Sequence, residues 1–333
     1  MRRTAKSIAF AFGVAILIAA VWCVRYTMHE LPLKASPMQF SISSGSSLRS
    51  ASQQMADAGV IRSAVAFEIL GRLFGDPKNI KAGNYEVEKG LTPLDLIDKL
   101  MRGNPAALAI TFVEGWTFRQ MRKTLDDHPD LRHETPGLSD LDILQRLGSN
   151  RTSAEGLFFP DTFHFSTGMT DLNILRRSFG LMQKHLDAQW EQRAPNLPLE
   201  TPYDALILAS IIEKETGRAI ERGVISAVFL NRLRLGMKLQ TDPTVIYGLG
   251  GGFDGNLRKQ DLLTDTPHNT YTRAGLPPTP IAMPGLASLH AALHPAATDA
   301  LYFVAKGDGS SHFSNNLEEH DRAVTKYQRS GKR

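Results

Sequence analysis

The sequence predicts an α+β protein with an N-terminal transmembrane helix, a small unit of strand, helix, helix and strand, and a larger, mostly helical domain with short strands. Three observations support this prediction. The chain opens with an uncharged apolar run, short alternating segments flank two helical patterns in its first third, and helical patterns dominate the rest. With 42% hydrophobic and 22% charged residues among 333, the chain can bury sizeable cores.

The apolar run from Ser7 to Val24 carries no charge and follows three basic residues within positions 1–6. As a helix it would be about 27 Å long, close to the thickness of a hydrocarbon core. The sequence after it has no clean small-x-small cleavage site, so an uncleaved anchor is favoured over a cleaved signal peptide. The basic residues would keep positions 1–6 as a cytoplasmic tail and place the chain from about residue 26 across the membrane.

Charge and cysteine content argue against two other classes of protein. Residues 7–333 hold 35 basic and 34 acidic residues, a net charge of +1. A nearly neutral body argues against nucleic acid as a partner. Cys23 is the only cysteine and lies in the apolar run, so a monomer has no disulfide framework.

Residues 25–37 contain two prolines and are expected to be a linker. The small unit is expected to cover residues 38–105. Phe40-Ser41-Ile42 alternates as a strand, residues 46–58 have helical spacing, a second helical run ends near position 74, and residues 83–87 return as a strand. A further helix from about position 92 to 101 follows the second strand.

The larger domain is expected to cover residues 106–329, followed by a tail at 330–333. It begins with the strand-like sequence ALAITF. Helical patterns then dominate, with motif-bearing loops between them, at about residues 117–126, 138–147, 171–193, 202–216 and 218–235.

The helix predicted within residues 201–218 holds the best catalytic candidate. Thr201 can cap its start, and residues 205–212 are apolar apart from one serine. A carboxyl group at the end of such a run risks desolvation, which favours the neutral, proton-donating form. Periodicity does not choose between Glu213 and Glu215, because each stacks over an apolar row.

Several segments, in their order along the chain, resemble those of the YceG-like family of endolytic murein transglycosylases. The resemblance covers roughly residues 38–329. The segments are EGLFFPDTFHF (155–165), LASIIEKETG (208–217), LQTDPTVIYGLG (239–250), NTYTRAGLPPTPIAMPG (269–285), LYFVAKGDGSSHFS (301–314) and EEHDRAV (318–324).

The resemblance implies an inner-membrane anchor at 7–24, a LysM-like module at 38–105 and a periplasmic catalytic domain at 106–329. It also implies that Glu213, the first glutamate of Ser-Ile-Ile-Glu-Lys-Glu-Thr, is the catalytic residue. Two positions depart from the family pattern: Phe163 replaces a tyrosine and Met283 replaces an asparagine. Neither departure touches Glu213.

The implied reaction is cleavage of the bond between MurNAc and GlcNAc in peptidoglycan without water. Glu213 would protonate the glycosidic oxygen and then take the proton of the MurNAc C6 hydroxyl, which closes on C1 to give a 1,6-anhydro end. The partners implied are glycan strands, the membrane and peptidoglycan synthases. No cofactor or metal is expected.

Four residues are predicted to bind the sugar chain: Asp242, Asn269, Thr270 and Tyr271. Carboxylate, amide, hydroxyl and aromatic groups suit carbohydrate, and loops often carry binding sites. For Asp242, which precedes a proline, capping of a turn is an equally good interpretation.

Other acidic residues are interpreted as structural. Glu155 and Asp161 flank a Phe-Phe-Pro run and are expected to be structural, with the aromatic side chains buried and Asp161 bonding to backbone groups. Glu114 precedes a glycine and is interpreted as a turn or domain-contact residue. For Glu215, a solvated face is as good an explanation as a functional role.

Two alternative functions compete with the transglycosylase. His290 and His294 have the spacing of zinc ligands on a helix, but residue 291 is alanine where H-E-x-x-H has glutamate. The other alternative is a non-catalytic peptidoglycan-binding scaffold of the wall-synthesis machinery.

Overall fold

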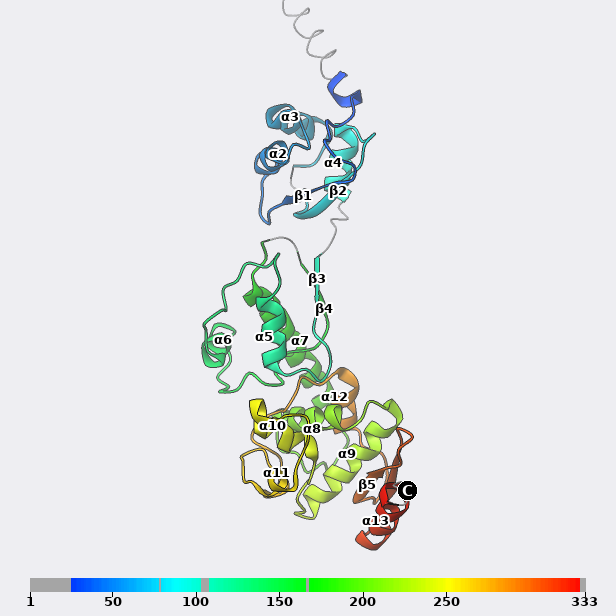
Figure 1. Ribbon diagram of the computed structural model, residues 1–333. Helices are drawn as coiled ribbons and strands as arrows, with labels where there is room; N and C mark the ends of the chain where they lie inside the picture. The colour runs from blue at the N-terminus through cyan, green and yellow to red at the C-terminus, as the bar shows by residue number, and fades with distance from the viewer. Residues whose placement is uncertain (1–24, 78, 103–107, 166–167, 330–333) are drawn as a thin grey trace, which may run out of the picture. The chain divides into compact units, whose positions relative to one another are not determined.

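The computed structural model describes residues 25–77, 79–102, 108–165 and 168–329 (Figure 1). The apolar run at 7–24, and with it the expected membrane span, lies outside these residues. Within them, no helix combines the length and the apolar character needed to cross a membrane. The chain divides into unit 1, which runs to Ile110 and includes 129–132 and 163–170, and unit 2, which contains the rest.

Unit 1 has the strand-helix-helix-strand order predicted from the sequence, followed by one more helix. Ser47 and Ser63 cap α2 and α3 with their side-chain oxygens. Strands β1 and β2 are antiparallel, with Met38 opposite Val87. The elements are β1 (Met38–Ile42), α2 (Leu48–Asp57), α3 (Ala64–Phe74), β2 (Gly83–Val87) and α4 (Pro93–Arg102).

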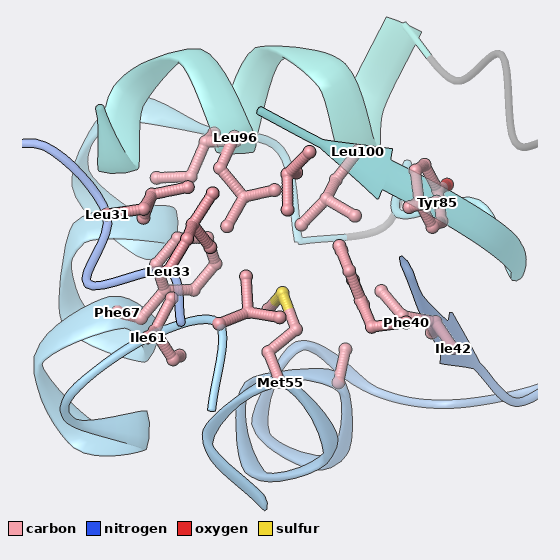
Figure 2. Close-up of a cluster of buried hydrophobic side chains, with 14 of the residues drawn as sticks. Leu31, Leu33, Phe40, Ile42, Met55, Ile61, Phe67, Tyr85, Leu96 and Leu100 are labelled. Atoms are coloured by element: carbon pink, nitrogen blue, oxygen red, sulfur yellow. The ribbon is translucent and has the colours of Figure 1, made fainter. Parts of the chain in front are cut away.

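The core of unit 1 forms where the inward side of the two strands meets the helices. Alternation along β1 buries Phe40 and Ile42, and these side chains join Met55, Tyr85 and Leu100 in one cluster (Figure 2). The removal of these apolar side chains from water is the main stabilising contribution in such a small unit.

Residues 25–37 differ from their prediction as a linker. Leu31 and Leu33 belong to the core of unit 1, and the N–H of Leu31 donates to the carbonyl of Leu91 at 2.8 Å. The physical reason is that both leucines gain by burial, and Pro32 between them fixes an extended backbone. This stretch is therefore folded into unit 1.

Unit 2 is mostly helical with short strands, which confirms the predicted α+β class. Strand β5 pairs with β6 in unit 2, whereas β3 pairs with β4, and most residues of these two strands belong to unit 1. In chain order the remaining elements are β3 (Leu108–Thr111), α5 (Phe118–Asp126), α6 (Asp140–Arg146), β4 (Thr162–Phe165), α7 (Asp171–Glu191), α8 (Pro202–Glu215), α9 (Ala219–Arg234), α10 (Asp242–Leu249), η1 (Gly250–Gly252), α11 (Lys259–Leu263), α12 (Leu286–Leu293), β5 (Tyr302–Ala305), β6 (Ser311–Ser314), α13 (Leu317–Val324) and η2 (Thr325–Arg329).

Helix α8 is the centre of unit 2. It starts where the sequence predicts, at a capping box in which the Thr201 hydroxyl and the Asp204 carboxylate each accept the other's backbone N–H. Every residue from Ala205 to Ile212 is buried. Helices α7, α9, α10 and α12 pack around it (Figure 1). The last turn of α8 is therefore held by neighbours on several sides.

Candidate active site

Glu213 lies in the last turn of α8 with only 7% of its side chain exposed. Its Oε2 accepts the backbone N–H of Gly285 at 3.0 Å, at the start of α12. Its Oε1 lies 3.9 Å from Nη2 of Arg222 on α9. Three separate helices thus fix one carboxylate.

A second carboxylate, that of Glu114, lies against the same glycine. A Cβ added to Gly285 would come 1.8 Å from Oε1 of Glu114. These contacts and standard backbone dimensions place the carboxylates of Glu114 and Glu213 no more than about 7 Å apart. Burial, and then the charge of Glu213, raise the pKa of Glu114, while Arg222 opposes the shift.

Backbone pairing holds Glu114 in this place. The N–H of Gly115 donates to the carbonyl of Met283 at 2.9 Å, and the N–H of Met283 donates to the carbonyl of Trp116 at 2.8 Å. The loop that carries Glu114 is therefore fixed to the segment that leads into α12.

The interpretation of Glu114 as only a turn residue is thus incomplete. Gly115 does have a positive φ of 77°, as a turn requires. Sequence reasoning missed the pairing with Met283 and Trp116, and with it Glu114, Arg222 and Gly285 as site residues. The segments are far apart in the chain, and neither shows a pattern that predicts their contact.

Glu215, the alternative to Glu213, has different neighbours. The hydroxyl of Thr241 donates to its carboxylate. Burial raises the pKa of Glu215 to about 7; the Thr241 hydrogen bond opposes this rise and the charge of Asp242 adds to it. A solvated face does not describe this glutamate.

The residues predicted to bind sugar gather on the Glu215 side of the site. The hydroxyl of Tyr271 donates to Oδ1 of Asp242 at 2.6 Å, and the N–H of Thr241 donates to the hydroxyl of Thr270 at 3.1 Å. Charges of Asp242 and Glu215 both raise the pKa of the Tyr271 hydroxyl, after burial as the largest cause. Asp242 and Tyr271 thus form one polar pair beside Glu215.

Asn269 and Thr270 are buried within their own loop, with 0% and 2% exposure. The Asn269 amide donates to the carbonyl of Thr264 at 2.6 Å, and its oxygen accepts the N–H of Tyr271 at 2.8 Å. These bonds favour a loop-shaping role for Asn269, and the bonds of the Thr270 hydroxyl to Thr241 and Thr244 favour the same role for Thr270. Sugar contact by any of the four predicted residues stays a prediction.

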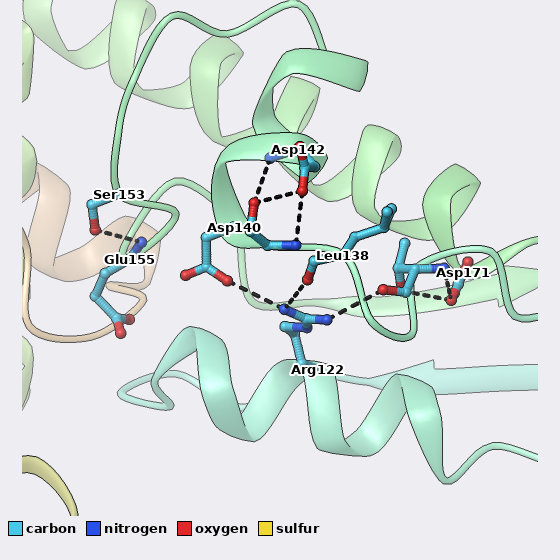
Figure 3. A network of polar contacts seen from close by, with 9 residues as sticks. Arg122, Leu138, Asp140, Asp142, Ser153, Glu155 and Asp171 are labelled. Carbon is cyan, nitrogen blue, oxygen red and sulfur yellow. Dashed lines mark hydrogen bonds and ion pairs between the residues drawn. The ribbon is translucent and has the colours of Figure 1, made fainter.

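A cleft of about 1120 Å³ in unit 2 runs up to this site. Lys214, which follows Glu213 in the chain, is part of its wall, and the Lys214 ammonium donates to the carbonyl of Gly115, next to Glu114, at 3.2 Å. The other wall comes from α5 and its neighbours, where Arg122 donates to the carbonyl of Leu138 and pairs with Asp140 (Figure 3).

Glu155 lines this cleft and is nearly buried, with 6% exposure. It accepts the N–H of Phe118 at 3.0 Å and the hydroxyl of Tyr247 at 3.2 Å. Burial raises its pKa to about 7, although both hydrogen bonds act in the opposite direction. Its bond to a backbone N–H agrees with the structural role predicted for it, as does the bond of the Thr162 N–H to the Asp161 carboxylate.

The paired histidines lie between α7 and α12. Nδ1 of His290 is 3.0 Å from Oε1 of Gln189, and Nε2 of His294 is 2.8 Å from the carbonyl of Gln192. The two rings stack with centroids 4.2 Å apart. Their contacts join the two helices and give the zinc-hydrolase alternative no support.

The pattern that defines the YceG-like family matches residues 40–326 of the chain. The chain belongs to the YceG-like family. An endolytic murein transglycosylase of Bacillus subtilis (strain 168) is 34% identical over 311 residues, which are 87% of this chain and 84% of that relative. A protein of the same name from Streptococcus pneumoniae serotype 2 is 26% identical, and the match covers 96% of this chain but only 64% of that relative.

The solved structures contain the same fold. The crystal structure of a YceG-like protein from Listeria monocytogenes matches 86% of this chain and 98% of its own, with a TM-score of 0.54 and 30% sequence identity. The mixed, mostly helical architecture is thus the architecture of a YceG-like protein.

We expect the contribution of Glu155 to the stability of the chain to fall as pH rises from about 4.5 to 7.5. The pKa of Glu155 is about 7 in the folded protein and about 4.3 in an unfolded chain, so the folded state binds more protons in this interval. The stabilisation is complete below the unfolded pKa and is lost as pH passes the folded pKa. Glu155 accounts for about 3 kcal/mol of this loss, and Glu215 acts with the same sign.

Urea unfolding of the wild type and of Glu155→Gln at pH 4.5 and 7.5 measures the effect. The variant should lose less free energy of unfolding between the two pH values, because its amide does not ionise. Equal losses in the two proteins would contradict the raised pKa of Glu155.

Proposed function

We propose that this chain is a peptidoglycan lytic transglycosylase that cuts glycan strands internally and leaves 1,6-anhydroMurNAc ends. The names of its relatives support the activity. The structural observation that carries the proposal is the pair of Glu213 and Glu114 on either side of Gly285, next to a cleft of about 1120 Å³ that Lys214 lines. Such a cleft suits a polymer, and the pair provides acid and base in one place.

Glu213 is the acid and base of the proposed reaction. In its neutral form it protonates the glycosidic oxygen while positive charge develops at C1 of MurNAc. As a carboxylate it then accepts the proton of the C6 hydroxyl, and that oxygen bonds to C1. The hydroxyl belongs to the same sugar, so its effective concentration is high and no bound water is required.

In the proposed reaction, Glu114 is a second carboxylate that helps the site to retain a proton. Two carboxylates so close disfavour simultaneous ionisation, so the pair retains a proton at a higher pH than an isolated glutamate does. After Glu213 has given its proton to the glycosidic oxygen, the negative charge of the carboxylate pair also stabilises the oxocarbenium-like centre at C1. Glu114 therefore provides a proton-holding neighbour for Glu213, since burial and the charge of Glu213 raise the pKa of Glu114.

Arg222 is placed to act on both carboxylates. Its guanidinium faces Oε1 of Glu213 and lowers the pKa of Glu114. Its Nε is buried and has no hydrogen-bond partner among the described residues. A substrate oxygen is a suitable acceptor for that N–H, because a buried donor without a partner costs free energy.

The proposed location is the periplasmic face of the inner membrane, on nascent glycan strands near peptidoglycan synthases. The uncharged run at 7–24 with its basic flank supports a single-pass anchor. The β1-α2-α3-β2 order of unit 1 supports a LysM-like module. In this arrangement the anchor keeps the cleft close to the site of strand synthesis.

Product analysis tests the reaction. Purified glycan strands cut by the full chain in ¹⁸O-labelled water should give unlabelled 1,6-anhydro ends, identified by mass, and internal cuts should precede small fragments. Glu213→Gln should lose about 10²–10⁴-fold in rate. Glu215→Gln, the matched variant two residues further along α8, should keep much of the activity.

Three results would contradict parts of this account. Reducing ends that carry ¹⁸O indicate hydrolysis, and Glu114 is then the first residue to test as the base that activates water. No products at all would favour the scaffold alternative. Loss of activity in Glu215→Gln with activity retained in Glu213→Gln would reverse the assignment within α8.

Replacing Gly285 by alanine should lower activity about tenfold or more, because the new methyl group occupies the place of the Glu114 carboxylate. Gly285 has an ordinary φ of −78°, and the displaced atoms are the mobile end of a side chain, so the thermal midpoint should change little. In a Glu114→Ala background the same substitution should have little further effect on the rate.

Gly180→Ala on α7 is the matched control, since no atom lies within 4 Å of its added Cβ. It should leave activity unchanged. Additive losses from Gly285→Ala and Glu114→Ala would show that the glycine does not act through Glu114.

A further inference from the structure

Helix α3 of unit 1 is apolar on both faces. Its inner face buries Ala66, Phe67 and Leu70 in the core. Its outer face carries Val65, Ile69 and Leu73, with exposures of 67%, 48% and 66%, and Phe74 is 60% exposed at the last position of the helix; we call these four apolar side chains the α3 stripe. An exposed apolar row in addition to a buried apolar face is suited to a second apolar environment outside the unit.

The stripe is a continuous surface and not a scatter of single residues. Val65, Ile69 and Leu73 follow one another at intervals of four and so lie in one row, about 12 Å long. Glu68 and Arg72 flank the row and pair with each other at 2.7 Å. The row itself contains no charged residue, and the two charges beside it neutralise each other.

The start of α3 lies beside the point where the apolar run of the chain ends. Arg25, Tyr26 and Arg62 line one small cavity of about 240 Å³, and α3 begins two residues after Arg62. Tyr26 packs against the core of unit 1. Because Leu31 and Leu33 are also in that core, no free linker separates residue 24 from unit 1.

We infer that the α3 stripe rests in the interfacial layer of the lipid bilayer. The inference depends on the proposed anchor at 7–24. If that run spans the membrane, the lipid surface lies near residue 25, and α3, about 16 Å long, starts within reach of it. The exposed Arg62, beside the start of α3, favours anionic headgroups.

Lipid docking gives unit 1 a fixed orientation on the membrane. A transmembrane helix alone leaves the attached domain free to tilt, whereas a second apolar contact restricts it. Burial of the α3 stripe in the acyl-headgroup boundary is the mode that surface helices use. Unit 1 then attaches to the membrane through its own surface, in addition to any binding of glycan.

A lipid-quenching measurement on the full chain tests the inference. In a Cys23→Ser background, a fluorescent label is attached to Ile69→Cys or, as control, to Gln53→Cys on the polar face of α2. Both positions are solvent-accessible, so folding should be retained. In vesicles of phosphatidylethanolamine and phosphatidylglycerol, nitroxide-bearing lipids should quench the Ile69 label at least about twofold more than the Gln53 label.

Three alternative outcomes would contradict the inference, and each can be distinguished from the others. Equal quenching in a chain that resists carbonate extraction leaves the anchor in place and removes the docking. A label at Ile69 that is shielded from water only at high protein-to-lipid ratio identifies a second copy as the occupant. A chain that carbonate extracts lacks the anchor, and the docking falls with it.

Discussion

The hydrogen bond from the N–H of Gly285 to the carboxylate of Glu213 is the contact on which the proposed site depends. It joins the end of α8 to the start of α12, two helices that pack against each other in unit 2. Because residue 285 has no side chain, the carboxylate of Glu114 occupies the space on its other side. The paired strands of backbone at Gly115 and Met283 complete the arrangement. A single residue without a Cβ therefore decides how closely the two acids approach.

Unit 2 holds several carboxyl groups in environments that favour their neutral form. Burial is the largest cause at Glu114, Glu155 and Glu215 alike. Such groups cost stability as soon as they ionise, since a buried charge is poorly solvated. Only Glu114 shares its surroundings with Glu213 and a guanidinium, that of Arg222. Glu155 and Glu215 accept hydrogen bonds from hydroxyl and backbone groups and help to fix the walls around the pair. In the proposed function the same physical effect thus serves chemistry at Glu114, while Glu155 and Glu215 have contacts that fix their surroundings.

The sequence predicted those parts of the molecule that local patterns encode. The start of α8 follows from the cap at Thr201, and its burial follows from the apolar run behind Glu213. The two strands of unit 1 follow from alternation, as at Phe40 and Ile42. Contacts between distant segments were not predictable, because no local pattern encodes the approach of Glu114 to Gly285. Pro32 suggested a linker, yet the leucines on either side of it joined the core. Asn269 suggested a sugar ligand from its chemistry alone, whereas its amide is satisfied by carbonyls of its own loop.

The coupling between the two carboxylates is the central claim, and a titration measures it most directly. Carbon-13 NMR of the full chain labelled at glutamate side chains, with Glu114→Gln to assign the signal, gives the pKa of Glu114. In the wild type this pKa should lie above the ordinary value for glutamate, because of burial and the nearby charge. In Glu213→Gln it should fall toward that value, since the charge is removed while the burial remains. A Glu114 pKa that is the same in both proteins would contradict the account.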